Sequence, residues 1–82
     1  MITEDHRNVS CGGDPFNYLK SVLKGLNIQL DPGQDAEVLV LKEKFPYDRV
    51  TFEGLARSTK LSLVDMKEED TDIRLLVRKP AQ

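Results

Sequence analysis

The feature of this sequence that most constrains its fold is the apolar run VLVL at positions 38–41. Charged residues bound it, with Glu37 before it and Lys42 after it. A short, continuous run of aliphatic residues between charges is typical of a strand buried inside a sheet. We therefore predict a central strand over 37–41 that other elements cover on both faces, or nearly so.

Two amphipathic helices are predicted, one before and one after this strand. The first begins at Asp14-Pro15, because aspartate accepts hydrogen bonds from first-turn amides and proline is favoured at the first helical position. The second occupies 47–58 with Asp48 as its cap, and a turn at 31–33 ends the first helix. Their apolar positions follow helical spacing: Phe16, Leu19, Leu23 and Leu26 in the first, and Phe52, Leu55, Ala56 and Thr59 in the second.

The C-terminal third of the chain predicts a β-hairpin. In its second strand, 72–78, apolar and charged residues alternate, which is typical of a half-buried strand. The acidic run 68–70 forms the turn, and the first strand is expected at 61–66. Side chains of that first strand are expected to divide between two faces, Leu61 and Leu63 on one and Val64 and Met66 on the other.

The first strand of the chain is expected at 7–11, and residues 1–6 are expected to form a loose polar leader. The element order is then β-α-β-α-β-β, in a single domain of residues 1–82. Because amphipathic helices must bury their apolar sides on a sheet, we predict an α/β (α+β) two-layer sandwich, with a four-stranded mixed sheet and both helices on one face. A right-handed crossover makes the first two strands parallel. The expected core is Phe16, Leu19, Leu23, Val38, Val40, Phe52, Leu55, Leu75 and Val77.

Composition narrows the classes of function. The chain has 82 residues, 39% of them hydrophobic, and a formal net charge of −2. It can therefore bury one modest core but not a deep small-molecule pocket, and it lacks the basic excess usual in nucleic-acid binders. No apolar run approaches the roughly 20 residues that span a bilayer, and the acidic start is not a signal peptide. A single cysteine fits a reducing, cytoplasmic location.

Cys11 is the only candidate for catalytic chemistry. Gly12 and Gly13 leave its sulfur unshielded, and a helix that begins a few residues later favours an anion, including a thiolate, near its N-terminus. Asp14 acts in the opposite sense, because a nearby carboxylate disfavours a thiolate. A lone cysteine at the end of a strand can equally be a small core residue, so a reactive and a structural Cys11 both remain open.

The other chemistry-bearing residues indicate no second site. If 6–11 is extended, His6 lies roughly 16 Å from Cys11 and on the opposite face, so we interpret His6 as a solvated leader residue rather than a base. One cysteine and one histidine are too few for a zinc site, and 68–72 lacks the pattern of a calcium loop, so we expect neither a metal nor a cofactor. The basic residues on or beside the helices form either an ordinary charged surface or a docking patch for an acidic partner: Lys20, Lys24, Lys42, Lys44, Arg49, Arg57 and Lys60.

Taken together, the element order and several turn residues resemble the TusA/SirA-like family of small sulfur-carrier proteins. The shared features are a strand that ends in cysteine, a proline-initiated helix, a Pro-Gly turn, an apolar strand, an aspartate-capped helix and a final hairpin. They correspond to 9–11, 14–16, 32–33, 38–40, 48–58 and 61–79. The hallmark of the family is Cys-Pro-x-Pro, where this chain has Cys11-Gly12-Gly13-Asp14-Pro15, so the resemblance carries over Cys11 alone.

The resemblance implies a persulfide relay. A sulfur-donor protein such as a cysteine desulfurase would load sulfur onto Cys11, and an acceptor sulfurtransferase would take it, in tRNA thiolation or another branch of sulfur metabolism. Such a protein is a sulfurtransferase-like carrier rather than an independent enzyme. The alternative is a non-catalytic protein-interaction or regulatory module of the same fold, in which Cys11 is structural.

Overall fold

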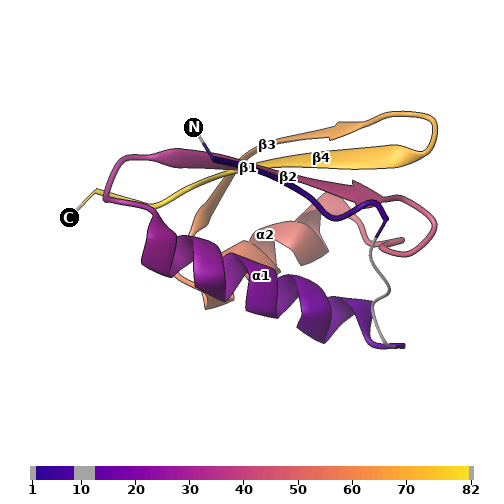
Figure 1. The fold of residues 1–82 in the computed structure, drawn as a ribbon, viewed down its shortest axis with the longest axis horizontal. Coiled ribbons are helices and arrows are strands. Elements are labelled where there is room, and N and C mark those ends of the chain that lie inside the picture. Colours follow the sequence, from indigo (N-terminus) through magenta and orange to yellow (C-terminus); the bar gives the residue numbers. More distant parts are fainter. Residues whose placement is uncertain (1, 9–12, 82) are drawn as a thin grey trace.

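Strands and helices follow one another along the chain in the predicted order, β-α-β-α-β-β (Figure 1). The structure is a computed structural model, which describes residues 2–8 and 13–81. Its elements are β1 (Ile2–Asp5), α1 (Pro15–Gln29), β2 (Asp35–Leu41), α2 (Arg49–Ser58), β3 (Ser62–Glu68) and β4 (Asp72–Arg78).

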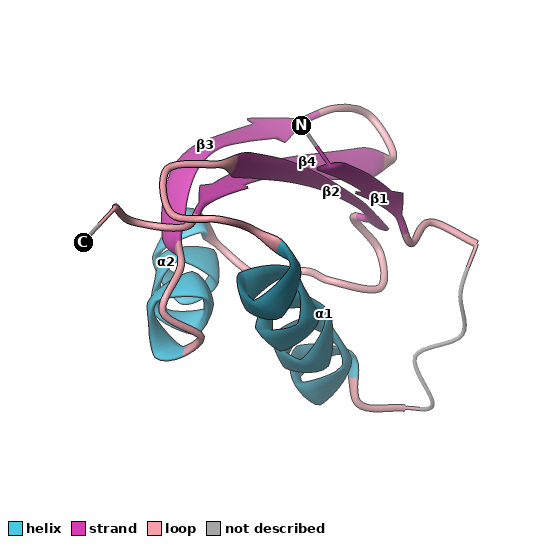
Figure 2. Ribbon diagram, turned by 60° about the vertical axis from the view of Figure 1, so that its left-hand side comes forward, coloured by secondary structure: helices cyan, strands magenta, loops and turns pink. Residues whose placement is uncertain are grey.

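The strands form one mixed sheet in the order β1-β2-β4-β3. β1 runs parallel to β2, whereas β4 is antiparallel to both β2 and β3. Both helices pack on the same face of this sheet (Figure 2). The predicted α+β two-layer sandwich and the parallel first pair of strands are therefore confirmed.

The position of the first strand was predicted wrongly. β1 is Ile2–Asp5, inside the segment expected to be a loose leader, and it pairs with residues 36–39 of β2. The expected strand at 7–11 begins instead with a turn at residues 7 and 8, and residues 9–11 lie outside the described residues. The Asp5 carboxylate accepts hydrogen bonds from the backbone N (3.0 Å) and Nε (2.9 Å) of Arg7, which favours a turn directly after β1.

Both helices begin at the predicted aspartate caps. Asp14 Oδ1 accepts a hydrogen bond from the backbone N of Asn17 (3.1 Å), and Pro15 is the first residue of α1. Asp48 Oδ1 accepts from the backbone N of Thr51 (2.9 Å), so α2 begins at Arg49 rather than at residue 47. Each cap satisfies an amide that has no partner within its own helix.

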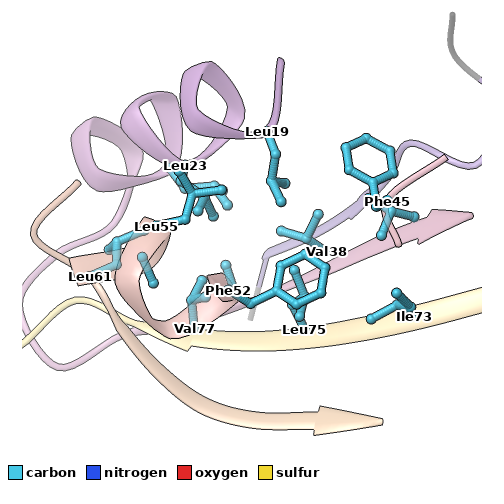
Figure 3. Packing of buried hydrophobic residues seen from close by; sticks show 14 of the residues in the cluster. Leu19, Leu23, Val38, Phe45, Phe52, Leu55, Leu61, Ile73, Leu75 and Val77 are labelled. Carbon is cyan, nitrogen blue, oxygen red and sulfur yellow. The ribbon is translucent and has the colours of Figure 1, made fainter. Parts of the chain in front are cut away.

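The core lies between the sheet and the two helices (Figure 3). Eight of the nine expected core residues are buried, and the exception is Phe16, which is 39% exposed in the first turn of α1. Phe45, which was not expected in the core, is fully buried. The error has a geometric cause: Phe16 contacts Tyr47 at the end of the layer instead of the sheet, whereas the turn after β2 directs Phe45 inwards.

Two predictions about strand faces also need correction. The helices cover only one face of β2, so Leu39 and Leu41 are half-buried on the open face rather than covered. In β3 the register shifts between Leu63 and Asp65, which leaves Val64 outside the pairing. Because a β-bulge reverses the alternation of faces, Leu63 and Met66 pack against the same core instead of lying on opposite faces.

Candidate functional site

The end of the sheet at which β1 and β2 finish is the candidate site. Both helices begin at this same end (Figure 1), and residues 6–14 join β1 to α1 in the sequence. In open α/β sheets, functional groups gather at the carboxyl ends of parallel strands. Cys11, the predicted catalytic residue, belongs to this segment but lies outside the described residues; the described part of the site consists of the residues that flank it.

The start of α1 shapes one side of the site. Gly13 has a φ of +85°, a left-handed conformation that favours glycine. Both carboxylate oxygens of Asp14 are engaged by Asn17, Oδ1 by its backbone N and Oδ2 by its side-chain Nδ2 at 2.7 Å. The negative charge of Asp14 therefore lies against the positive end of the helix and offsets part of its attraction for another anion.

A hydrogen-bonded chain of three side chains crosses from β1 to α1. His6 Nε2 lies 2.8 Å from Glu4 Oε1, and His6 Nδ1 lies 2.8 Å from the hydroxyl oxygen of Tyr18. The side chain of His6 is only 17% exposed, and its ring meets that of Tyr18 edge-on at a centroid distance of 5.6 Å. The interpretation of His6 as a solvated leader residue is therefore wrong.

The hydrogen bonds of His6 depend on which of its ring nitrogens carries the proton. When His6 Nε2 carries the proton it donates to Glu4, and Nδ1 then accepts from the Tyr18 hydroxyl. Both ring nitrogens thus have hydrogen-bond partners on other side chains, Glu4 and Tyr18. His6 therefore links the end of β1 to the first turn of α1.

Aromatic rings fill the rest of this end of the molecule. The ring of Tyr18 lies 6.5 Å from that of Phe45, measured between centroids. A second series begins with Phe16, whose ring lies 6.0 Å from that of Tyr47, which in turn lies 5.8 Å from Phe52. The last two contacts are edge-on, an arrangement that adds to the stability gained from burial. These ring contacts connect α1 with the turn after β2 and with α2.

The turn after β1 is held by ion pairs of Arg7. Arg7 contacts Asp5 through Nη2 (2.7 Å) and Asp72 through Nη1 (2.9 Å), and so ties the end of β1 to the start of β4. The hydrogen bond from the Arg7 side chain lowers the pKa of Asp5 from 3.8 to about 2. Sequence reasoning missed this network because it depends on the position of β1; the period-two spacing of Ile2, Glu4 and His6 was the available signal.

A surface hollow also lies at this end of the sheet. It has a volume of about 510 Å³ and lies between the end of β2 and the β3–β4 turn, with Lys42 and Asp70 among its lining residues. Lys42 contacts Glu68 (3.8 Å) and the backbone O of Glu69 (3.4 Å). Within residues 2–8 and 13–81, no group of three His, Cys, Asp or Glu side chains is placed to hold a metal ion, and no helix is long and apolar enough to cross a membrane.

Comparison of the chain with protein-family models, with curated proteins and with solved structures gave no match. Function is therefore inferred from the residues and from their geometry.

Proposed function

We propose that this chain is a small sulfur carrier, which accepts sulfur on Cys11 as a persulfide and passes it to a partner protein. The observation that supports the proposal is the order β-α-β-α-β-β with both helices on one face of the sheet, which the resemblance to the TusA/SirA-like family implies. In the sequence, Cys11 precedes by four residues a helix with an N-terminal proline, as the resemblance also implies.

The relay consists of two exchanges at sulfur. In the first, the Cys11 thiolate attacks the terminal sulfur of a donor persulfide; the donor S–S bond breaks, and its electron pair leaves with the donor cysteine as a thiolate. The terminal sulfur keeps its proton and is now bonded to Cys11. In the second, a thiolate of the acceptor attacks that sulfur, and Cys11 leaves as a thiolate, so no external oxidant or reductant is required.

The partners follow from these steps. The donor is a protein that forms a cysteine persulfide, such as a cysteine desulfurase, and the acceptor is a sulfurtransferase that serves tRNA thiolation or another branch of sulfur metabolism. Neither step needs a metal or a cofactor on this chain. A reducing cytoplasm suits both exchanges, because it keeps Cys11 available as a thiol.

Intact mass after incubation with a cysteine desulfurase and cysteine tests the proposal. We expect a gain of one sulfur atom, about 32 Da, which a reductant removes as it would a persulfide. Cys11→Ser is a clean control because the chain has no other cysteine, and it should fold normally but gain no mass. Failure of the wild-type chain to gain sulfur would contradict the proposal.

A second candidate is a non-catalytic interaction or regulatory module of the same fold, in which Cys11 is structural. The basic residues without ion-pair partners on the outer side of the helices, described below, favour it, since they need no thiol chemistry. The measurements that select it are slow alkylation of Cys11 at neutral pH, no gain of sulfur and marked destabilisation by Cys11→Ser.

A further inference from the structure

Charge is unevenly distributed between the two layers. α1 contains Lys20 and Lys24 but no acidic residue, and Arg57 and Lys60 lie at and just after the end of α2. In the strands, acidic residues outnumber basic ones. The acidic residues there are Glu4, Asp5, Asp35, Glu37, Asp65, Glu68 and Asp72, and the basic ones are Lys67, Arg74 and Arg78. The helical layer is thus positive within a chain whose formal net charge is −2.

The two arginines of the strands are paired with carboxylates of the strands. Arg78 Nε lies 2.6 Å from Asp35 Oδ1, and Arg74 Nη1 lies 3.5 Å from Glu37 Oε2. On the helices the only comparable pair is Arg49 with Glu53, at 2.9 Å. Among the residues that the structure describes, no ion pair involves Lys20, Lys24, Arg57 or Lys60.

These unpaired cations share one surface with exposed apolar side chains. Phe16, Lys20, Lys24 and Ile28 follow one another at intervals of four residues and so lie along one side of α1. Ile28 is 83% exposed, and Val50, at the start of α2, is 75% exposed. We call this surface the basic helix face; it comprises Lys20, Lys24, Arg57 and Lys60 with Phe16, Ile28 and Val50.

The two helices present this surface together. α1 and α2 lie side by side beneath the sheet (Figure 2), and the side-chain Nδ2 of Asn27 donates to the backbone O of Lys60 (3.3 Å) at their C-terminal ends. The four cations therefore belong to the helical layer, which lies on one face of the sheet. Such a charge separation orients an approaching charged partner before contact.

We infer that the basic helix face binds an acidic surface of a protein partner. Exposed apolar side chains among unpaired cations resemble the make-up of protein interfaces, in which an apolar centre is bordered by charges. Because no residue of this face takes part in sulfur exchange at Cys11, the inference goes beyond the proposed function and holds equally for a non-catalytic module.

Two other anionic surfaces fit less well. A membrane-surface helix must present a wide apolar face to the lipid, but α1 buries its own apolar face, Leu19, Leu23 and Leu26, in the core. A nucleic acid requires many phosphate contacts, whereas this face offers four unpaired cations on a chain of net negative charge. An acidic protein surface needs only a few such contacts.

Backbone-amide NMR titration with a synthetic peptide of alternating glutamate and leucine tests the inference. We expect shift changes in α1 and in residues 57–60, and an affinity that falls as salt screens the charges. The double variant Lys20→Glu/Lys24→Glu should weaken binding by at least about tenfold, as loss of paired interface charges does.

Matched single variants separate this face from overall charge. Lys24→Glu and Lys67→Glu change the net charge equally, but Lys67 is exposed on β3, so only Lys24→Glu should weaken binding, and Lys24→Gln should weaken it less than Lys24→Glu. Retained helical circular dichroism shows that the variants are folded. Equal effects of Lys24→Glu and Lys67→Glu, shift changes confined to the sheet, or binding of single-stranded DNA or phosphatidylglycerol vesicles but not of the peptide would each overturn the inference.

Discussion

Removal of the Tyr18 hydroxyl should destabilise the fold, because it removes the hydrogen bond between Tyr18 of α1 and His6, which follows β1. Tyr18→Phe keeps the ring, and with it the edge-on contact to His6 and the contact to Phe45, so it isolates the hydroxyl. The bond that is lost is short, 2.8 Å, and leaves His6 Nδ1 without this partner in a side chain that is only 17% exposed. A polar group that loses its partner in a largely buried site costs about 1–3 kcal/mol, and partial access of water to His6 places the expected loss at about 1.5 kcal/mol.

Urea unfolding measures this loss. For a domain of this size, an m value of about 1 kcal/mol per M converts it into a shift of the midpoint by about 1.5 M, and the melting temperature should fall by roughly 10 °C. Tyr47→Phe is the matched control, because the Tyr47 hydroxyl has no hydrogen-bond partner among the described residues, and it should change stability by less than about 0.5 kcal/mol.

A double-mutant cycle decides whether the His6–Tyr18 bond is responsible. His6→Ala, Tyr18→Phe and the double variant should show a coupling energy of about 1 kcal/mol, which separates this bond from every other contact of either side chain. Additive effects, or equal stabilities of Tyr18→Phe and Tyr47→Phe, would show that the His6–Tyr18 hydrogen bond does not stabilise the fold.

Two further predictions concern acid stability and the core. The pKa of Asp5 is lowered from 3.8 to about 2 by Arg7, so its contribution to stability is present above about pH 4 and is lost as the pH falls towards 2; Asp5→Asn should therefore flatten the stability profile over that interval, and an unchanged profile would contradict the pairing. Leu75 is buried in β4 whereas its neighbour Leu76 is half-buried on the open face, so Leu75→Ala should cost about 2–5 kcal/mol in urea unfolding and Leu76→Ala no more than about 1 kcal/mol; equal costs would show that the open face is covered.

The elements predicted correctly are those whose signals are local. Asp14-Pro15 and Asp48 mark helix starts because a cap acts within one turn, and the alternation over 72–78 specifies which side of β4 is buried. The spacing of Leu19, Leu23 and Leu26 is enough to identify the buried side of α1. Each of these patterns is complete within a short stretch of sequence.

The errors arise where a distant partner decides the structure. β1 is short and at the edge of the sheet, and its strand conformation depends on pairing with β2, more than thirty residues later in the chain. The bulge at Val64 is similarly imposed by the pairing with β4, because the sequence of β3 alone indicates a simple alternation. The Glu4–His6–Tyr18 network could not be foreseen once β1 had been placed at 7–11. Edge pairing and bulges are thus the features that local patterns do not specify.

The charge of Asp14 should restrain the reactivity of Cys11, and Asp14→Asn tests this without loss of the helix cap. Asparagine caps helices about as well as aspartate, so α1 should remain intact. The substitution removes the negative charge that offsets the positive end of the helix dipole. Asp14 follows Cys11 by three residues, which limits their Cα separation to about 11 Å, close to the screening length of about 8 Å at physiological salt. Alkylation of Cys11 by iodoacetamide at neutral pH should therefore be faster in Asp14→Asn than in the wild type, and the difference should shrink at high salt. Asp31→Asn, which removes the same charge after the far end of α1, should leave the rate unchanged. If Asp14→Asn reacts no faster than Asp31→Asn, the charge of Asp14 does not act on the thiol. The aspartate that stands at the position of the second proline of Cys-Pro-x-Pro then does not lower the reactivity of Cys11.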